Sequence, residues 1–168
     1  MPLQNRVTPL GDIVADPHRA LFTGNRGIIH APATRTLLRK GWALQAWIIC
    51  ACQFRNVRRE PMGRNRPGGK AGWTELFFLD EVTALAAGHR PCFFCRRERA
   101  DDFVRRFGEA SGIAEPRAPM VGKRLHKERL ASGGKPPGVK LGDLAALPDG
   151  AMDADGGTAY ALRYGTAL

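Results

Sequence analysis

The sequence predicts a small α+β domain, and three observations carry this prediction. Residues 42–54 and 73–78 are rich in aromatic and β-branched side chains, a composition typical of strands. Apolar residues with helical spacing follow them, and turn residues bracket short apolar runs near residues 150–164. Because 168 residues suffice for one hydrophobic core but not for two, we expect a single domain over residues 1–168.

The first strands are expected to form a long β-hairpin. Residues 1–41 are rich in Gly, Pro and Asn, so loops with one or two short strands are predicted there. Residues 42–54 give the first strand of the hairpin, and residues 73–78 give the second. The intervening residues 55–72 are basic and contain many Gly and Pro residues, as expected of a tip that projects into solvent.

Two short helices are predicted on either side of a compact turn at residues 92–95. Asp80 and Glu81 place acids at the start of the first helix, where they complement the helix dipole, and Gly88 ends it. The second helix has apolar residues at positions i, i+3, i+4 and i+7, namely Ala100, Phe103, Val104 and Phe107. The C-terminal part, residues 108–168, is predicted to contain a short helix over 123–130, a linker over 132–138 and a small β-hairpin near 150–164.

The positive charge is concentrated in one segment. The chain carries a net charge of +10, and between Arg19 and Lys70 eleven basic residues stand against a single acid, Glu60. A localised positive field is what binding to a polyanion requires, since each neutralised phosphate releases condensed counterions. The alternative is a generally arginine-rich composition, because 20 of the 26 basic residues are arginine.

Nucleic acid, DNA rather than RNA, is therefore the expected partner. The primary phosphate contacts are predicted in the hairpin tip, at Arg55, Arg58, Arg59, Arg64, Arg66 and Lys70, and secondary ones beside the compact turn, at Arg90, Arg96 and Arg97. The tryptophans Trp42, Trp47 and Trp73 are expected in the core rather than as platforms for bases. The N-terminus has no export signal, and no segment reaches the roughly 20 apolar residues of a membrane span. We expect a cytoplasmic protein without membrane contacts.

The cysteines indicate a metal site. In the cytoplasm they stay reduced, and Cys92-x-x-Cys95 after a proline has the spacing of a zinc knuckle. The alternative, a redox dithiol, is disfavoured by the bulky residues between the cysteines and by the lack of a βαβ pattern. Cys50 and Cys52 share one face of a strand, but about 6.6 Å separates their Cα atoms, so both reach one ion only where the strand ends or bulges. Otherwise one or both are small buried apolar residues.

A known family shares this arrangement. Residues 83–97 (TALAAGHRPCFFCRR) resemble the end of the zinc-binding methylphosphotriester-repair domain of the Ada adaptive-response proteins. Ile48-Ile49-Cys50 matches the strand that carries the first cysteine of that domain, and Phe77-Phe78 matches its aromatic strand. The resemblance covers about residues 42–107, the expected zinc-binding core. The blocks TELFFLDE and GHRPC are also similar to those of an uncharacterised bacterial family.

The resemblance implies that Cys50, Cys92 and Cys95 are zinc ligands and that Cys50 is the methyl-accepting thiolate. The family's second cysteine falls on Phe54, and its aromatic residue before Arg-Pro-Cys falls on His89. The fourth ligand is therefore open among Cys52, His89, His30 and His126, and we favour Cys52 because it lies closest to Cys50.

Two enzymatic alternatives accompany the leading hypothesis, which is a zinc-stabilised nucleic-acid-binding protein. One is alkyl transfer onto Cys50, because zinc keeps a cysteine as the nucleophilic thiolate. The other is a metal-dependent nuclease, in which His126 and Glu128 would supply a base and a carboxylate within one helical turn. Glu75, Asp80 and Glu81 are further acids, each explained more simply by its place on a strand or at a helix start.

Overall fold

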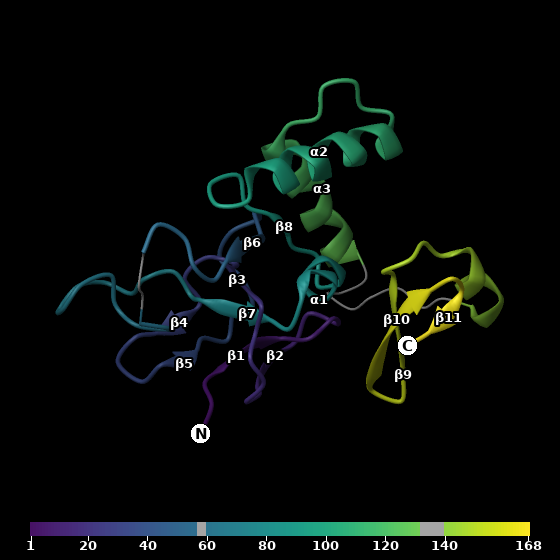
Figure 1. Cartoon of the computed structure of the whole chain (residues 1–168). Helices are drawn as coiled ribbons and strands as arrows, with labels where there is room; N and C mark the ends of the chain where they lie inside the picture. Colours follow the sequence, from purple (N-terminus) through teal and green to yellow (C-terminus); the bar gives the residue numbers. More distant parts are fainter. Residues whose placement is uncertain (57–59, 132–139) are drawn as a thin grey trace.

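The computed structural model describes residues 1–56, 60–131 and 140–168 (Figure 1). Within them the chain combines three α-helices with three β-sheets, which confirms the predicted α+β class. Arg58 and Arg59, two of the expected phosphate contacts, lie outside the described residues. No helix in the described part of the chain is both long and apolar enough to cross a membrane.

A six-stranded sheet forms the centre of the fold, with the strand order β2-β1-β7-β3-β6-β8. Its strands are β1 (Gln4–Val7), β2 (Ile13–Ala15), β3 (Phe22–Asn25), β6 (Ile48–Ala51), β7 (Leu76–Phe78) and β8 (Arg90–Pro91). A separate pair, β4 (His30–Ala31) and β5 (Thr36–Leu37), lies beside it. Residues 1–41 thus contribute five strands instead of the expected one or two. Strands such as β3, with its Gly and Asn, follow from pairing with distant segments rather than from their own propensity.

The predicted long hairpin is wrong. β3 lies between β6 and β7 and pairs antiparallel with both, so these two strands run parallel and are not neighbours. Residues 42–47 also stay outside the strand. The segment between β6 and β7 is a crossover that carries its own small turn, in which Arg64 pairs with Ala71 and the amide of Asn65 donates to the carbonyl of Lys70 over 3.0 Å. This segment extends away from the C-terminal sheet (Figure 1).

The two faces of the sheet have different roles. Because side chains alternate along a strand, Ile49, Leu76 and Phe78 point to one face. There they are buried with Val7 and pack against Ala84 and Ala87. Complete burial of each large side chain contributes about 1.5–3 kcal/mol. The other face carries Cys50, Thr23 and Phe77, which the strand register aligns in one row.

The helices lie where the sequence predicts them. In α1 (Glu81–Ala86) the side chain of Asp80 accepts a hydrogen bond from the amide of Thr83, and Gly88 at φ +79° ends the helix. α2 (Arg97–Ser111) follows the turn at 92–95. α3 (Ala118–Ala131) begins five residues before the expected segment. The chain ends with a 3₁₀ helix (Leu141–Ala146) and a sheet of β9 (Met152–Asp155), β10 (Thr158–Arg163) and β11 (Thr166–Ala167), which spans the expected C-terminal hairpin.

Candidate metal centre and adjoining pocket

Three cysteines from two distant segments converge at the end of β6. β8 pairs in parallel with β6, and the amide of Cys92 extends this pairing by donating to the carbonyl of Ile49 over 2.9 Å. The turn after β8 then brings Cys95 back toward the same strand. The Sγ atoms of Cys50, Cys92 and Cys95 all lie within 4.8 Å of one another, an arrangement able to hold a metal ion.

Backbone amides surround these sulfurs. The amides of Phe94 (3.4 Å) and Cys95 donate to the sulfur of Cys92, and the amide of Ala51 donates to the sulfur of Cys95. This is the geometry expected of a knuckle with two residues between its cysteines. Amide donors stabilise negative charge on sulfur, so the turn is organised to hold thiolates.

The three thiols differ strongly in acidity. The Cys50 thiol and the backbone amides lower the pKa of Cys92 to about 5. The same contact with Cys92 and burial raise the pKa of Cys50, while burial foremost raises that of Cys95. Like charges this close disfavour each other, so the second and third thiolates form only when a cation neutralises them.

Cys52, favoured as the fourth ligand, is not part of the group. It lies just beyond β6, is exposed, and has a sulfur that does not join the other three. β6 ends at Ala51, yet the chain beyond it does not bring the sulfur of Cys52 to the other three. Among the described residues, no other His, Cys, Asp or Glu completes the group at this distance.

The histidines considered as ligands have other partners. His89 is buried with its ring 5.2 Å from that of Trp47 and 4.7 Å from that of Phe78, and it accepts a hydrogen bond from Arg26. It therefore packs as an aromatic ring in the core. His30 uses both ring nitrogens, on the hydroxyl of Thr74 (2.7 Å) and the carbonyl of Gly63 (3.0 Å).

The residues suggested for a hydrolase do not form a site. The ring of His126 packs edge-on against Trp42 at 4.4 Å. The carboxylate of Glu128 accepts from Arg124 over 2.7 Å on the exposed side of α3. Because these two side chains serve separate contacts, nothing in the described residues joins them to a metal group.

The other acids also have structural partners. Asp80 caps α1, and Glu81 pairs with Arg96 over 2.6 Å. The carboxylate of Glu75 accepts a hydrogen bond from the amide of Met62. These contacts agree with the simpler explanation that their positions on a strand and at a helix start suggest.

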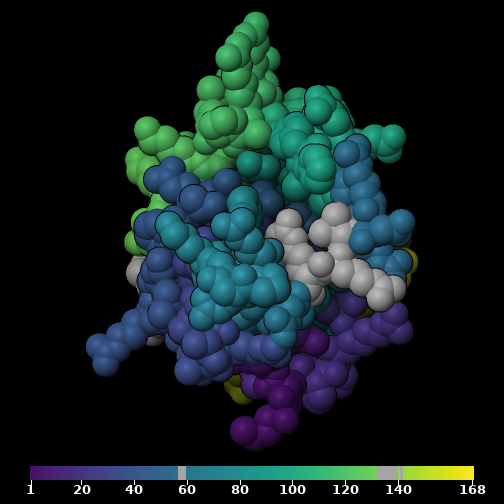
Figure 2. All heavy atoms as spheres, turned by 90° about the vertical axis from the view of Figure 1, so that its left-hand side faces the viewer, coloured from purple at the N-terminus to yellow at the C-terminus, as the bar shows by residue number. Residues whose placement is uncertain are grey.

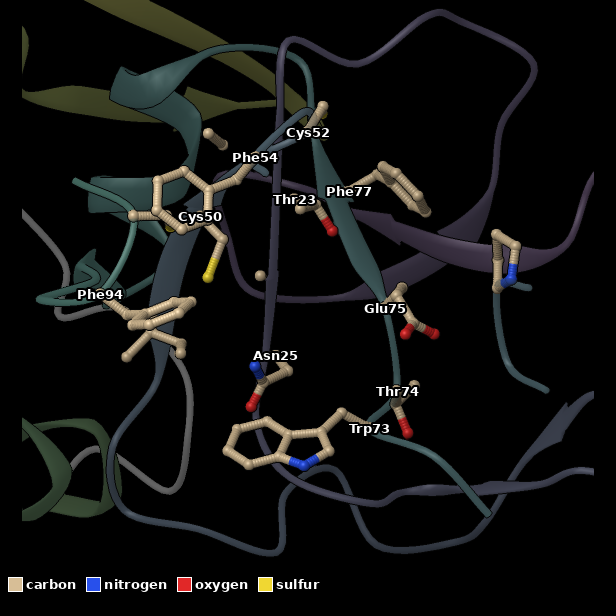
Figure 3. A pocket seen from close by; sticks show the side chains of 15 residues that line it. Thr23, Asn25, Cys50, Cys52, Phe54, Trp73, Thr74, Glu75, Phe77 and Phe94 are labelled. Carbon is tan, nitrogen blue, oxygen red and sulfur yellow. The ribbon is translucent and has the colours of Figure 1, made fainter. Parts of the chain in front are cut away.

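A pocket of about 420 Å³ adjoins the cysteines, and Figure 3 shows the side chains that line it. Because Thr23, Cys50 and Phe77 line it, the pocket lies on the face of the sheet opposite the core. Cys50 and Cys95 contribute to its wall, together with Cys52. Sites with four protein ligands are typically closed and structural, whereas sites with three protein ligands keep a position for water or substrate. Three sulfurs beside a pocket would leave such a position open on a bound ion.

The basic residues fall into two groups. Arg64, Arg66 and Lys70 are exposed on the turn between β6 and β7, and Arg97 is exposed at the start of α2. In contrast, Arg90 is buried with its guanidinium over Phe93, and Arg96 is only partly exposed, with its guanidinium over Phe22. The expectation that these two contact phosphates is wrong, because both guanidinium groups pack on aromatic rings within the protein, and that of Arg96 also pairs with Glu81. Arg55 is also exposed, and its guanidinium lies over the rings of Phe54 and Phe94 at 5.1 and 5.2 Å.

Aromatic residues around the pocket were not singled out from the sequence. Trp73 is 44% exposed and lines the pocket with Phe54 and Phe94, so the expectation that it belongs to the core is wrong. Trp42 is exposed as well, and Trp47 alone of the three tryptophans is buried. The position of Trp73, directly after a Gly-rich loop, was the available signal that it lies at a surface.

Comparison with known proteins identifies no relative. No family model matches the chain, and neither a curated protein nor a solved structure is significantly similar to it.

Proposed function

We propose that this protein binds zinc through Cys50, Cys92 and Cys95 and binds nucleic acid through the adjoining basic surface. The convergence of three sulfurs from segments 42 residues apart is the observation that carries the proposal. Zinc is the preferred cation for such a set, since soft thiolates at about 2.3 Å from a tetrahedral ion lie about 3.8 Å from one another. This separation is compatible with the limit of 4.8 Å found here.

The metal would link two parts of the fold. Cys50 belongs to the central sheet, whereas Cys92 and Cys95 precede α2. An ion shared between them would fix the turn against β6. Its positive charge would also stabilise the thiolates of Cys50 and Cys95, whose pKa values are raised in its absence. Metal binding at neutral pH thus replaces protons on these two thiols.

The surface beside the pocket supports the nucleic-acid part of the proposal. We call residues 64–70 (RNRPGGK) the basic tip; it has three cations and no acid. It is held in shape by the amide of Gly69 donating to the carbonyl of Arg66 (2.9 Å) and by Arg64 donating to the carbonyl of Gly69 (2.7 Å). Figure 2 shows the segment after β6 spread over this face of the molecule. A preformed positive turn is suited to a phosphate backbone.

Salt dependence tests this function. The protein is expected to bind DNA at about 50 mM salt and to lose affinity steeply as salt rises. The triple variant Arg64→Gln, Arg66→Gln, Lys70→Gln should reduce the slope of log affinity against log salt by about 2 to 3, one unit per lost phosphate contact. Fluorescence anisotropy with a labelled duplex and a labelled single strand measures both quantities.

A control variant separates this local effect from net charge. Arg105→Gln, Arg106→Gln, Arg124→Gln removes the same charge from arginines that are paired with acids on α2 and α3. It should leave the slope nearly unchanged. Equal losses in the two variants, or no salt-dependent binding at all, would refute the basic tip as the contact.

The pocket favours a second candidate function, alkyl transfer onto Cys50. Cys50 is a member of the sulfur group and also lines the pocket, so a substrate has access to it. In this reaction the thiolate of Cys50 forms a bond to the methyl carbon of a methylated phosphotriester, the carbon–oxygen bond breaks, and the phosphodiester anion leaves with the electron pair. Mass spectrometry after incubation with methylated DNA should find one added methylene, confined to Cys50. An unmodified Cys50 would exclude this candidate and leave the binding function intact.

A further inference from the structure

The pocket beside the cysteines has walls of aromatic side chains from separate segments. Trp73 comes from the segment before β7, whereas Phe54 and Phe94 come from the segments after β6 and β8. Figure 3 shows Trp73 on one side of the cavity and the two phenylalanines on another. The rings of Phe54 and Phe94 meet edge to face at 5.2 Å, so they form one apolar wall.

These aromatic residues are not part of the core. Phe94 is 69% exposed and Trp73 is 44% exposed, although the core cluster lies on the opposite face of the same sheet. Large apolar side chains gathered around a concave surface are typical of a ligand site rather than of a packing surface. The volume of about 420 Å³ is within the range of sites for small ligands.

The pocket also offers hydrogen-bonding groups on its sheet wall. Asn25 is buried, and its Oδ1 accepts from the amide of Gly27 over 3.2 Å, which leaves the Nδ2 donor for the pocket. In the described residues this donor has no partner. The hydroxyl of Thr23 donates to the carbonyl of Leu76 over 2.9 Å, so its oxygen remains free to accept. A donor and an acceptor on one wall suit the polar edge of a planar heterocycle.

Positive charge lies at the rim of the same pocket. The guanidinium of Arg55 covers the rings of Phe54 and Phe94, which line the pocket. A ligand that matches all these features has a flat aromatic ring with a hydrogen-bonding edge and an attached anion. A nucleotide has this chemistry.

We infer that the pocket takes one unstacked nucleobase, with its ring against Trp73 and its phosphate toward Arg55. The inference rests on the proposed nucleic-acid binding and makes it more specific, since a base is accessible in this way only in a single strand or where it leaves the duplex. Stacking on aromatic side chains accepts any base, so the pocket distinguishes single strands from duplexes more than one sequence from another.

The test compares two single strands that carry the same number of phosphates. One is a labelled oligothymidylate of about 12 nucleotides, and the other is an abasic strand of the same length. The full chain should bind the oligothymidylate between about 5- and 150-fold more tightly, the range for one stacked base. Trp73→Ala should abolish this difference without weakening binding to the abasic strand. Trp42→Ala, which removes another exposed tryptophan that packs on His126, should retain the difference.

The outcomes separate the two proposals. Equal binding of both strands by the unaltered chain would overturn the base pocket and leave phosphate binding in place. If neither strand binds at low salt, the nucleic-acid function is wrong. Whether the pocket binds a free nucleotide is then tested by adding thymidine 5′-monophosphate and measuring the quenching of Trp73 fluorescence. Quenching that Trp73→Ala removes would retain the pocket as a site for a free nucleotide. No quenching would overturn it.

Discussion

Cys92→Ser is expected to leave the chain without its metal and to unfold the domain. The serine hydroxyl does not replace a thiolate whose sulfur accepts two amide hydrogen bonds and lies within 4.8 Å of two other sulfurs. A structural zinc contributes about 10–16 kcal/mol to the folding of small zinc-binding peptides. This is as large as the whole stability of a typical domain, about 5–15 kcal/mol. Elemental analysis of the purified protein and circular dichroism during thermal unfolding measure the two effects.

Cys52→Ser is the matched control. It makes the same chemical change two residues from Cys50, at an exposed side chain outside the sulfur group. This variant should keep about one zinc per chain and a normal unfolding transition. The proposed centre would be refuted by a Cys92→Ser protein that stays folded with its zinc, or by loss of zinc from Cys52→Ser alone. Removal of the metal from the unaltered protein with a chelator should reproduce the Cys92→Ser result.

Local patterns in the sequence predicted those parts of the fold that depend on neighbouring residues. α1 begins after Asp80, whose side chain caps the helix, and it ends at Gly88, which adopts the left-handed conformation. Both signals depend only on residues within one turn of the helix end, so the sequence shows them directly. The same holds for Cys92 and Cys95, whose spacing already predicts that their sulfurs lie close enough for one ion to reach both. Cys50 is 42 residues away from Cys92, so spacing alone does not predict that the two are close. That prediction came from the family resemblance.

Features that depend on distant pairing were not predictable in this way. The local sequence patterns of β6, β7 and the loop between them all agree with a hairpin. In the structure, however, β3 lies between the two strands. Its four residues, FTGN, carry only one apolar side chain, so their pattern gives no sign of a central strand. Likewise, the charge of Arg96 beside the cysteines suggested a phosphate contact, but its guanidinium lies over Phe22 and pairs with Glu81. Such placements depend on the tertiary structure.

Gly24→Ala is expected to cause the second large loss of stability, because Gly24 is the residue that lets β3 fit between its neighbours. A Cβ atom at this position would collide with the carbonyl oxygen of Ile48 and lie 2.9 Å from a ring carbon of Phe78. The carbonyl belongs to backbone that is paired in the centre of the sheet, so it does not yield as a flexible side chain would. We expect the free energy of unfolding to fall by about 3 kcal/mol, measured by chemical denaturation.

The same substitution should lower the affinity for zinc, although Gly24 is not one of the proposed ligands. Relief of the collision requires Ile48 to move away from β3, and Cys50 lies two residues further along the same short strand. Zinc affinity, measured by competition with a chromogenic chelator, is therefore expected to fall together with stability. Gly41→Ala is the control, since an added Cβ there meets no atom within 4 Å. Its unfolding free energy should stay within about 1 kcal/mol of the original value. If Gly24→Ala were as harmless as Gly41→Ala, the placement of β3 against β6 would be wrong, and with it the strand that holds Cys50 in position.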